Sequence, residues 1–239
     1  MRLDKLLGNN GFGTRKEVKQ LIRKGTVKVN GTLEKDPGAH IDPAADEVTL
    51  LGEPVIHQEF IYLMMNKPQG VISATEDSRE RTVIDLLTEE EQRFEPFPVG
   101  RLDKDTEGLL VLTNDGKLAH ELLSPKKDVP KTYYAVIDQE VTESDVSAFA
   151  EGVILDDGFE TKPGILRILA AGDQSEIELT ITEGKFHQVK RMFEAVGKNV
   201  VFLKRISMGT LRLDAGLAPG AFRELTEEEV TGLDPRKKD

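Results

Sequence analysis

The sequence predicts an α+β protein in which a mixed, mostly antiparallel sheet follows a small α/β module. From residue 60 onward, strand-like runs follow one another without long helices between them, which favours such a sheet over a doubly wound one. Near the N-terminus, a short helical segment leads into an alternating strand and an Asn-Gly turn. The 239 residues are 38% hydrophobic and 31% charged, which is typical of a globular protein.

The N-terminal elements define a small module that we place at residues 1–58. Thr14 is a suitable N-cap for a helix from Arg15 to Lys24, and Gly25 is a suitable stop. Val18, Leu21 and Ile22 are spaced so that they face the core of this helix. Residues 26–29 alternate as a strand, and Asn30-Gly31 predicts a hairpin turn after them.

The remaining residues, 59–239, form the second predicted domain. The run 176–182 alternates strictly between apolar and polar residues, which predicts a strand with one buried face. Other strands are expected at 60–65, 109–113, 132–137 and 200–206, and helices at 117–123, 143–150 and 187–196.

Basic residues gather in two stretches of a chain whose net charge is −11. Residues 1–35 contain nine Lys or Arg against three acids, and residues 184–205 contain six against one. Basic patches on an acidic body are typical of a selective polyanion binder, although a solvated basic helix face remains an alternative for each stretch. The residues predicted to contact RNA in these stretches are Arg2, Arg15, Lys16, Lys19, Arg23, Lys28, Lys185, His187, Gln188 and Arg191.

Composition excludes several classes of protein and site. No apolar run approaches the roughly 20 residues that span a bilayer, and the N-terminus does not resemble a signal peptide, so we expect a cytoplasmic protein. The lack of cysteine excludes disulfides, thiol nucleophiles and thiolate metal sites. Four scattered histidines do not favour a zinc site, and we predict no metal.

Three short segments contain nearly all groups that could perform chemistry. The glycine-bounded turn 100–108 crowds charged residues before an apolar strand; its Asp103 and Asp105 could hold a divalent metal or form surface ion pairs. Residues 131–136 contain Tyr133 and Tyr134, which should face opposite sides of a strand. Residues 183–193 place a glycine and Lys185, His187 and Gln188 at a helix start, which suits a phosphate or a polar base edge.

Taken together, these segments resemble one family, the RsuA-type pseudouridine synthases, which isomerise a uridine in ribosomal RNA. The motifs that carry the resemblance are 65–70, 100–110, 131–134 and 184–192. Residues 2–7, Thr14-Arg15 and 25–31 resemble the alpha-L, S-four-type RNA-binding domain. The resemblance extends over essentially the whole chain and implies the pseudouridine synthase type of catalytic domain after an RNA-binding module.

The resemblance also implies roles for individual residues. Asp103 matches the catalytic aspartate, Tyr133 the tyrosine that stacks on the target base, and Lys190 the basic residue that pairs with the aspartate. Arg101 matches the arginine that helps hold the place of the flipped nucleotide. The reaction has no net redox change and needs no external reactant, so no cofactor is expected.

Four interpretations of function remain open at this point. The motifs look most like those of enzymes acting on small-subunit (16S) ribosomal RNA, with large-subunit (23S) RNA as the alternative. A noncatalytic ribosome-associated RNA-binding protein and a metal-dependent nuclease built on Asp103 and Asp105 are the others. The expected partner is ribosomal RNA or a small-subunit assembly intermediate, without a membrane, and a monomer is the simplest expectation.

Overall fold

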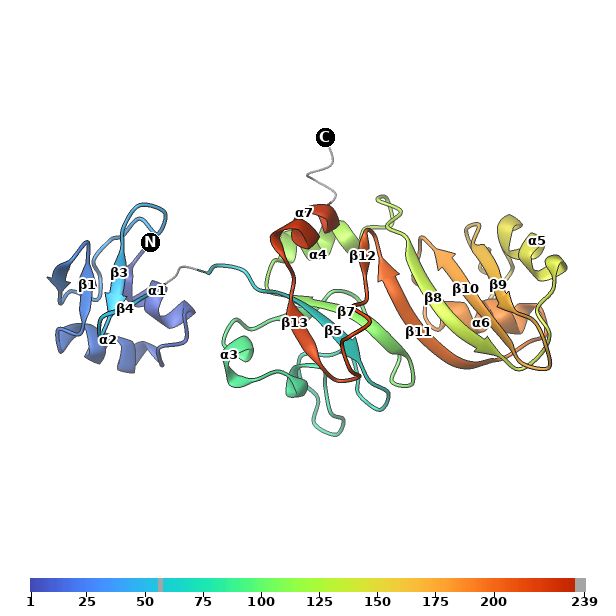
Figure 1. The fold of residues 1–239 in the computed structure, drawn as a ribbon, viewed down its shortest axis with the longest axis horizontal. Helices are drawn as coiled ribbons and strands as arrows, with labels where there is room; N and C mark the ends of the chain where they lie inside the picture. Colours follow the sequence, from blue (N-terminus) through green and yellow to red (C-terminus); the bar gives the residue numbers. More distant parts are fainter. Residues whose placement is uncertain (56–57, 235–239) are drawn as a thin grey trace. The chain divides into compact units, whose positions relative to one another are not determined.

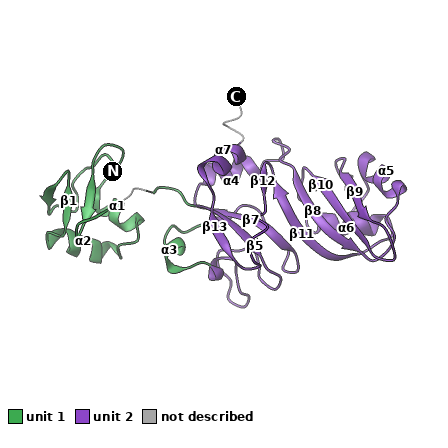
Figure 2. Ribbon diagram, viewed as in Figure 1, with its two compact units in different colours: residues 1–61, 87–96 green, residues 62–86, 97–239 purple. Residues whose placement is uncertain are grey.

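A computed structural model describes residues 1–55 and 58–234 of the chain (Figure 1). It divides into two compact units (Figure 2). Unit 1 comprises Met1–Ile61 and Leu87–Pro96, and unit 2 comprises Tyr62–Leu86 and Phe97–Asp239. The predicted domain boundary after residue 58 stays a prediction.

Unit 1 contains the predicted helix and hairpin. Its helices are α1 (Leu3–Asn9), α2 (Arg15–Arg23) and α3 (Glu89–Gln92), and its strands β1 (Val27–Val29), β2 (Thr32–Glu34), β3 (Val48–Leu50) and β4 (Glu53–Pro54) form an antiparallel sheet in the order β2-β1-β3-β4. Thr14 caps α2 in a capping box with Glu17, and Asn30 and Gly31 both have the positive φ that a type I′ hairpin requires.

The core of unit 1 lies between its helices and its sheet. Val18 and Ile22 of α2 are fully buried, as their spacing predicts. They pack with other apolar side chains from α1, β1, β3 and the connecting segments: Leu3, Leu6, Leu7, Val27, Ile41, Val48, Leu50 and Val55.

Unit 2 is built on a nine-stranded sheet. Its central order is β13-β5-β7-β11-β8-β10-β9, with β12 beside β11 and β6 beside β7. Every described strand pair of this sheet is antiparallel except β7 with β11. The strands are β5 (Tyr62–Lys67), β6 (Phe97–Pro98), β7 (Glu107–Thr113), β8 (Lys131–Ile137), β9 (Ile165–Ala170), β10 (Ser175–Ile181), β11 (Val200–Met208), β12 (Leu211–Arg212) and β13 (Phe222–Glu224).

Helices cover the two halves of this sheet separately. α4 (Gly116–Leu123) and α7 (Glu227–Leu233) lie side by side near β5 and β7, and they share an apolar cluster with Met64 and Met208 (Figure 1). In the other half, α5 (Glu143–Glu151) packs against β9 and α6 (Gln188–Ala195) against β11. Phe149 of α5 meets Phe193 of α6 edge to face, with ring centroids 4.9 Å apart. A short 3-10 helix, η1 (Ile84–Leu86), completes the unit.

The predicted α+β class with a mostly antiparallel sheet is confirmed. All five predicted strands and three predicted helices of this region are present, with ends that differ by one or two residues in most cases. Strands β9 and β13 and helix α7 are not predicted by the sequence patterns. β9 is an edge strand whose exposed residues include Ile165 and Leu169, so it lacks the apolar-polar alternation by which strands are recognised.

The parallel pairing of β7 with β11 positions the turn that precedes β7. Gly108 lies opposite Arg205, and a Cβ atom at Gly108 would lie 2.2 Å from the Arg205 carbonyl oxygen. Gly108 also has φ +106°, which favours glycine. A larger residue would therefore push the two strands apart at the place where residues 100–106 enter the sheet.

Candidate active site

One pocket of unit 2 brings together the three segments that the sequence analysis selected. The turn before β7 contributes Asp103, β8 contributes Tyr133, and the start of α6 contributes His187. The complete lining is Arg101, Leu102, Asp103, Thr106, Tyr133, Ile181, Gly184, Lys185, His187, Gln188, Val189 and Leu203. The predicted catalytic residues Asp103 and Tyr133 therefore face one cavity although 30 positions separate them.

Hydrogen bonds to backbone groups fix the turn that carries Asp103. Ser73, which is buried, accepts a hydrogen bond from the Leu102 amide and donates one to the Leu102 carbonyl, both at 3.0 Å. The Thr106 amide donates to the Asp103 carbonyl at 3.1 Å. Because both sides of Asp103 are tied to the fold, its carboxylate can stay partly exposed without the turn losing its shape.

Lys67, at the end of β5, binds carbonyl oxygens of the same turn. Its fully buried ammonium donates to the carbonyl oxygens of Pro68, Asp103 and Thr106 at 2.9–3.0 Å and lies 3.5 Å from that of Lys104. Burial lowers the pKa of Lys67 to about 8, while the carboxylates of Asp103, Asp105 and Glu107 oppose this shift. No role for Lys67 was predicted from the sequence, although a lysine at the end of an apolar run can indicate a buried cation.

Two basic side chains, His187 and Lys190, lie beside the Asp103 carboxylate. His187 Nε2 lies 3.6 Å from Oδ1 and Lys190 Nζ lies 3.5 Å from Oδ2, with the Asp103 side chain 28% exposed. Lys190 makes shorter bonds to Asp105, at 2.7 and 2.9 Å. Its hydrogen bonds lower the pKa of Asp105. Lys190 is thus shared between two carboxylates, and its tighter contact is with Asp105.

Tyr133 and its neighbour Tyr134 face opposite sides of β8, as the strand period predicts. Tyr133 is nearly buried and lines the pocket, while Tyr134 donates to Glu176 at 2.8 Å on the other face. Only Tyr133 is therefore placed to touch a molecule in the pocket.

Two further cations are buried near Tyr133. Arg205 pairs with Tyr133 across the sheet, and its Nε donates to the Leu109 carbonyl at 2.8 Å. Lys131 donates to the Val129 carbonyl at 3.0 Å. Burial, reinforced by the charge of Arg205, lowers the pKa of Lys131 to about 8, while Asp128 opposes the shift.

The lowered pKa of Lys131 predicts a pH effect on stability. Between about pH 8 and pH 10.5 the unfolded lysine keeps a proton that the folded lysine has lost, so the free energy of unfolding should rise with pH over this window. Urea unfolding measures the free energy of unfolding of the wild type and of Lys131→Met. The wild-type value minus the variant value should increase by about 1–2 kcal/mol from about pH 7.5 to about pH 9.5. A difference that stays constant with pH would contradict the prediction.

The segment before α6 uses several predicted RNA contacts internally. Gln188 is buried; its side chain accepts a bond from the Lys185 amide and donates to Glu183. Lys185 Nζ lies 4.5 Å from the centroid of the Phe159 ring. Arg191 forms ion pairs with Asp156 and Asp157, which raise its pKa. The RNA-binding roles of Lys185, His187, Gln188 and Arg191 stay predictions.

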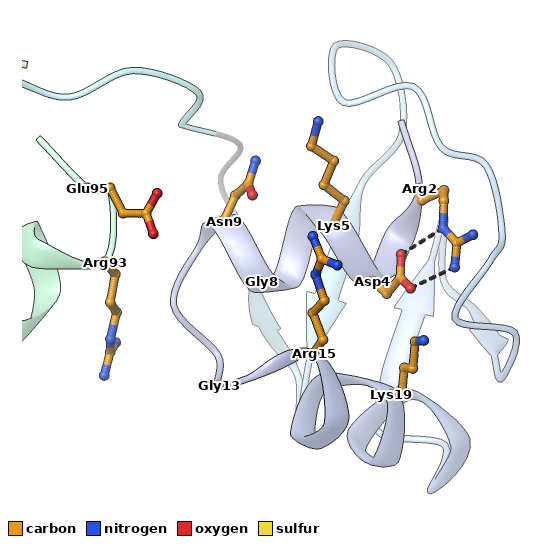
Figure 3. Close-up of a pocket in the computed structure, with 10 residues that line it drawn as sticks. All are labelled: Arg2, Asp4, Lys5, Gly8, Asn9, Gly13, Arg15, Lys19, Arg93 and Glu95. Atoms are coloured by element: carbon orange, nitrogen blue, oxygen red, sulfur yellow. Dashed lines mark hydrogen bonds and ion pairs between the residues drawn. The ribbon is translucent and has the colours of Figure 1, made fainter. Parts of the chain in front are cut away.

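In unit 1, some of the predicted RNA-binding residues meet at a second pocket (Figure 3). Arg15 and Lys19 of α2 line it together with Arg2, which is bound to Asp4 at 2.7 Å. Lys28 lines a separate hollow with Gly25 and Thr49, and Lys16 and Arg23 line neither. The pocket that contains Arg15 and Lys19 is lined by Arg2, Asp4, Lys5, Gly8, Asn9, Gly13, Arg15, Lys19, Arg93 and Glu95.

Neither a metal-binding cluster nor a membrane-spanning helix is found among the described residues. In residues 1–55 and 58–234, the His, Asp and Glu side chains form no group of three or more that could hold a metal ion. Within the same ranges, no helix has the length and apolar character to cross a membrane.

Comparisons with known proteins agree with one another. The model of the family described as RNA pseudouridylate synthase matches residues 61–195, and that of the S4 domain matches residues 1–48. A Bacillus subtilis protein named as an uncharacterized RNA pseudouridine synthase is 60% identical over 96% of this chain and 97% of its own length. The crystal structure of a pseudouridylate synthase matches with a TM-score of 0.69 and 37% identity, covering 98% of this chain and 99% of that one.

Two relatives with named ribosomal RNA targets have nearly the same sequence identity to this chain. The ribosomal small subunit pseudouridine synthase A of Escherichia coli is 38% identical over 98% of this chain and 100% of its own length. The ribosomal large subunit pseudouridine synthase B of Bacillus subtilis is 39% identical over 97% and 95%.

Proposed function

Because the chain belongs to the RNA pseudouridylate synthase family, as an RsuA-type member with an N-terminal S4 domain, we propose that it converts a uridine of 16S ribosomal RNA to pseudouridine. Asp103 is the catalytic aspartate in this proposal. The observation that carries it is the pocket where the Asp103 carboxylate, Tyr133 and the start of α6 meet.

The reaction requires few chemical groups. The N1–C1′ bond of uridine breaks, the uracil turns, and a C5–C1′ bond forms. The C5 proton leaves for solvent and N1 takes up a proton, so the formula does not change. Asp103 can act as a nucleophile at C1′ or as a base at C2′. Both routes use the Asp103 carboxylate, and Lys190 Nζ lies 3.5 Å from its Oδ2.

Tyr133 and Arg101 act on the flipped nucleotide in this proposal. Tyr133 lies on the pocket wall and can hold the uracil ring by stacking while it turns. Arg101 lines the same pocket from the turn that carries Asp103, where it can occupy the place in the RNA helix that the uridine has left. Isomerisation balances without an oxidant or a second substrate, so the proposal includes no cofactor.

Release of tritium from RNA labelled at uridine C5 tests the proposed chemistry. Full-length protein should release tritium from a 16S transcript or from a small-subunit assembly intermediate and leave the RNA chain intact. No release from any ribosomal RNA would favour a noncatalytic RNA-binding protein. Strand cleavage that EDTA abolishes would favour a metal-dependent nuclease.

The choice of 16S over 23S RNA rests on the motifs 66–70 and 186–190 and on the E. coli small-subunit relative. The B. subtilis large-subunit enzyme is almost as similar, so 23S RNA is the second candidate. Mapping pseudouridines in ribosomal RNA from cells with and without the gene decides between them: one pseudouridine should disappear from 16S RNA. Its disappearance from 23S RNA alone would overturn the choice.

We further propose that residues 1–58 dock the enzyme on its RNA and that residues 59–239 form the catalytic domain. The protein would act as a monomer in the cytoplasm, where ribosomes assemble. The S4 match and the cluster of Arg2, Arg15 and Lys19 support the docking role.

Neutralising this cluster should weaken docking. In an Arg15→Ala/Lys19→Ala variant, RNA affinity should fall about tenfold or more, and the slope of log affinity against log salt should decrease by about 0.7–0.9 per lost phosphate contact. Filter binding over a range of salt concentrations measures both. Lys117→Ala/Lys126→Ala is the matched control, because it removes two exposed lysines of unit 2 outside the pocket. Equal affinities and slopes for the two variants would refute the docking role.

A further inference from the structure

Phe186 is a large apolar side chain left in solvent at the edge of the candidate active site. It is 70% exposed, whereas the next most exposed phenylalanines, Phe12 and Phe60, are 38% exposed. Leaving such a ring in water forgoes the stabilisation that burial gives. Its neighbours Lys185 and His187 both line the pocket, so the ring stands where RNA must approach.

The ring is held in a defined orientation by His187. The two rings stack with centroids 3.8 Å apart and an interplanar angle of 18°. His187 adopts the left-handed conformation, with φ 50° and ψ 29°, directly before α6. This conformation is uncommon for a residue other than glycine, and it sharply turns the chain between Phe186 and the helix.

The stack connects Phe186 to the reacting carboxylate. On the other side of the stack, His187 Nε2 lies 3.6 Å from Asp103 Oδ1. The His187 ring therefore lies between the exposed Phe186 ring and Asp103, the residue that we assign to catalysis. A base resting on Phe186 would belong to a nucleotide next to the target uridine.

The chemistry around Phe186 favours a base over a phosphate. Arg191 lies near the Phe186 carbonyl, with 3.5 Å between Nη1 and the oxygen, but its charge is taken up by Asp156 and Asp157. The phenylalanine ring itself carries no hydrogen-bonding group. A ring of this kind recognises the face of an unpaired base, and every base offers one.

We propose that Phe186 is a stacking platform for an unpaired nucleobase adjacent to the target uridine. The proposal rests on the proposed function, because it takes RNA as the substrate of the pocket. It implies that the enzyme selects a uridine in a loop or single strand, since a paired neighbour could not reach the ring. Phe186 is then a positioning residue for RNA and makes no contact with the bond that breaks.

A fluorescent RNA tests the proposal without requiring turnover. The probe is a nine-nucleotide RNA of uridines with 2-aminopurine at its centre, whose emission falls when the base stacks. Full-length wild type should quench it, whereas Phe186→Ala should lose the quenching and bind about tenfold more weakly. Phe186→Trp should restore both. With the probe in a duplex, wild type and Phe186→Ala should behave alike.

Ile165→Ala is the matched control, since Ile165 is similarly exposed, at 73%, but does not line the pocket. It should leave quenching and affinity unchanged. If Phe186→Ala quenches and binds as wild type does while its circular dichroism is native, the platform is refuted. Tritium release from ribosomal RNA labelled at uridine C5 separates this proposal from the proposed function. If quenching depends on Phe186 but no tritium is released, the proposed chemistry alone is overturned. If tritium is released but quenching does not depend on Phe186, the platform alone is overturned.

Discussion

Replacing Asp103 by asparagine should abolish isomerisation while RNA binding persists. The amide keeps the size of the side chain but can act neither as a nucleophile nor as a base, so the rate should fall by about 10⁴-fold or more. Affinity should change little, because the contacts assigned to docking lie in residues 1–58. Single-turnover tritium release measures the rate, and filter binding measures the affinity.

Asp105→Asn is the matched control for this experiment. Asp105 belongs to the same turn and binds the same lysine at 2.7 Å, yet it is 69% exposed and does not line the pocket. The proposed mechanism gives it no reacting role, so we expect its rate to stay within about tenfold of wild type. Equal losses in the two variants would contradict the assignment of Asp103 and favour the metal site that needs both carboxylates.

The local elements of this fold could be predicted because their causes are local. The capping box at Thr14, the hairpin at Asn30-Gly31 and the alternation along β10 each follow from neighbouring residues. The parallel pairing of β7 with β11 could not, because Gly108 and Arg205 are distant in sequence. Nothing near Gly108 in the sequence indicates which strand approaches it so closely.

The same limit applies to the candidate site. The resemblance selected Asp103, Tyr133 and Lys190, and the fold places the first two on one pocket and Lys190 within 3.5 Å of Asp103. It did not indicate that Lys190 binds Asp105 more closely. That preference depends on the path of the turn. The turn is held by hydrogen bonds between Ser73 and Leu102 and between a buried lysine elsewhere in the chain and the Asp103 carbonyl.

This buried lysine, Lys67, gives the second large effect. Lys67→Met keeps an unbranched side chain of similar length but removes the donor that binds the carbonyl oxygens of Pro68, Asp103 and Thr106. A buried acceptor left without its donor costs about 1–3 kcal/mol, so the free energy of unfolding should fall by about 3 kcal/mol or more. Activity should also fall at temperatures where the variant is still folded, because the turn that carries Asp103 loses its anchor.

Lys104→Met separates this effect from the loss of a lysine in general. Lys104 lies in the same turn, but its side chain is half exposed and forms a surface ion pair with Glu80 at 2.6 Å. Such pairs contribute about 0–1 kcal/mol to stability. The urea midpoint of unfolding of this variant should therefore be close to that of the wild type, and its activity should be retained. If Lys67→Met and Lys104→Met unfold at the same urea concentration, the turn does not depend on Lys67. If Lys67→Met is destabilised yet fully active when folded, the lysine supports the fold without placing the aspartate.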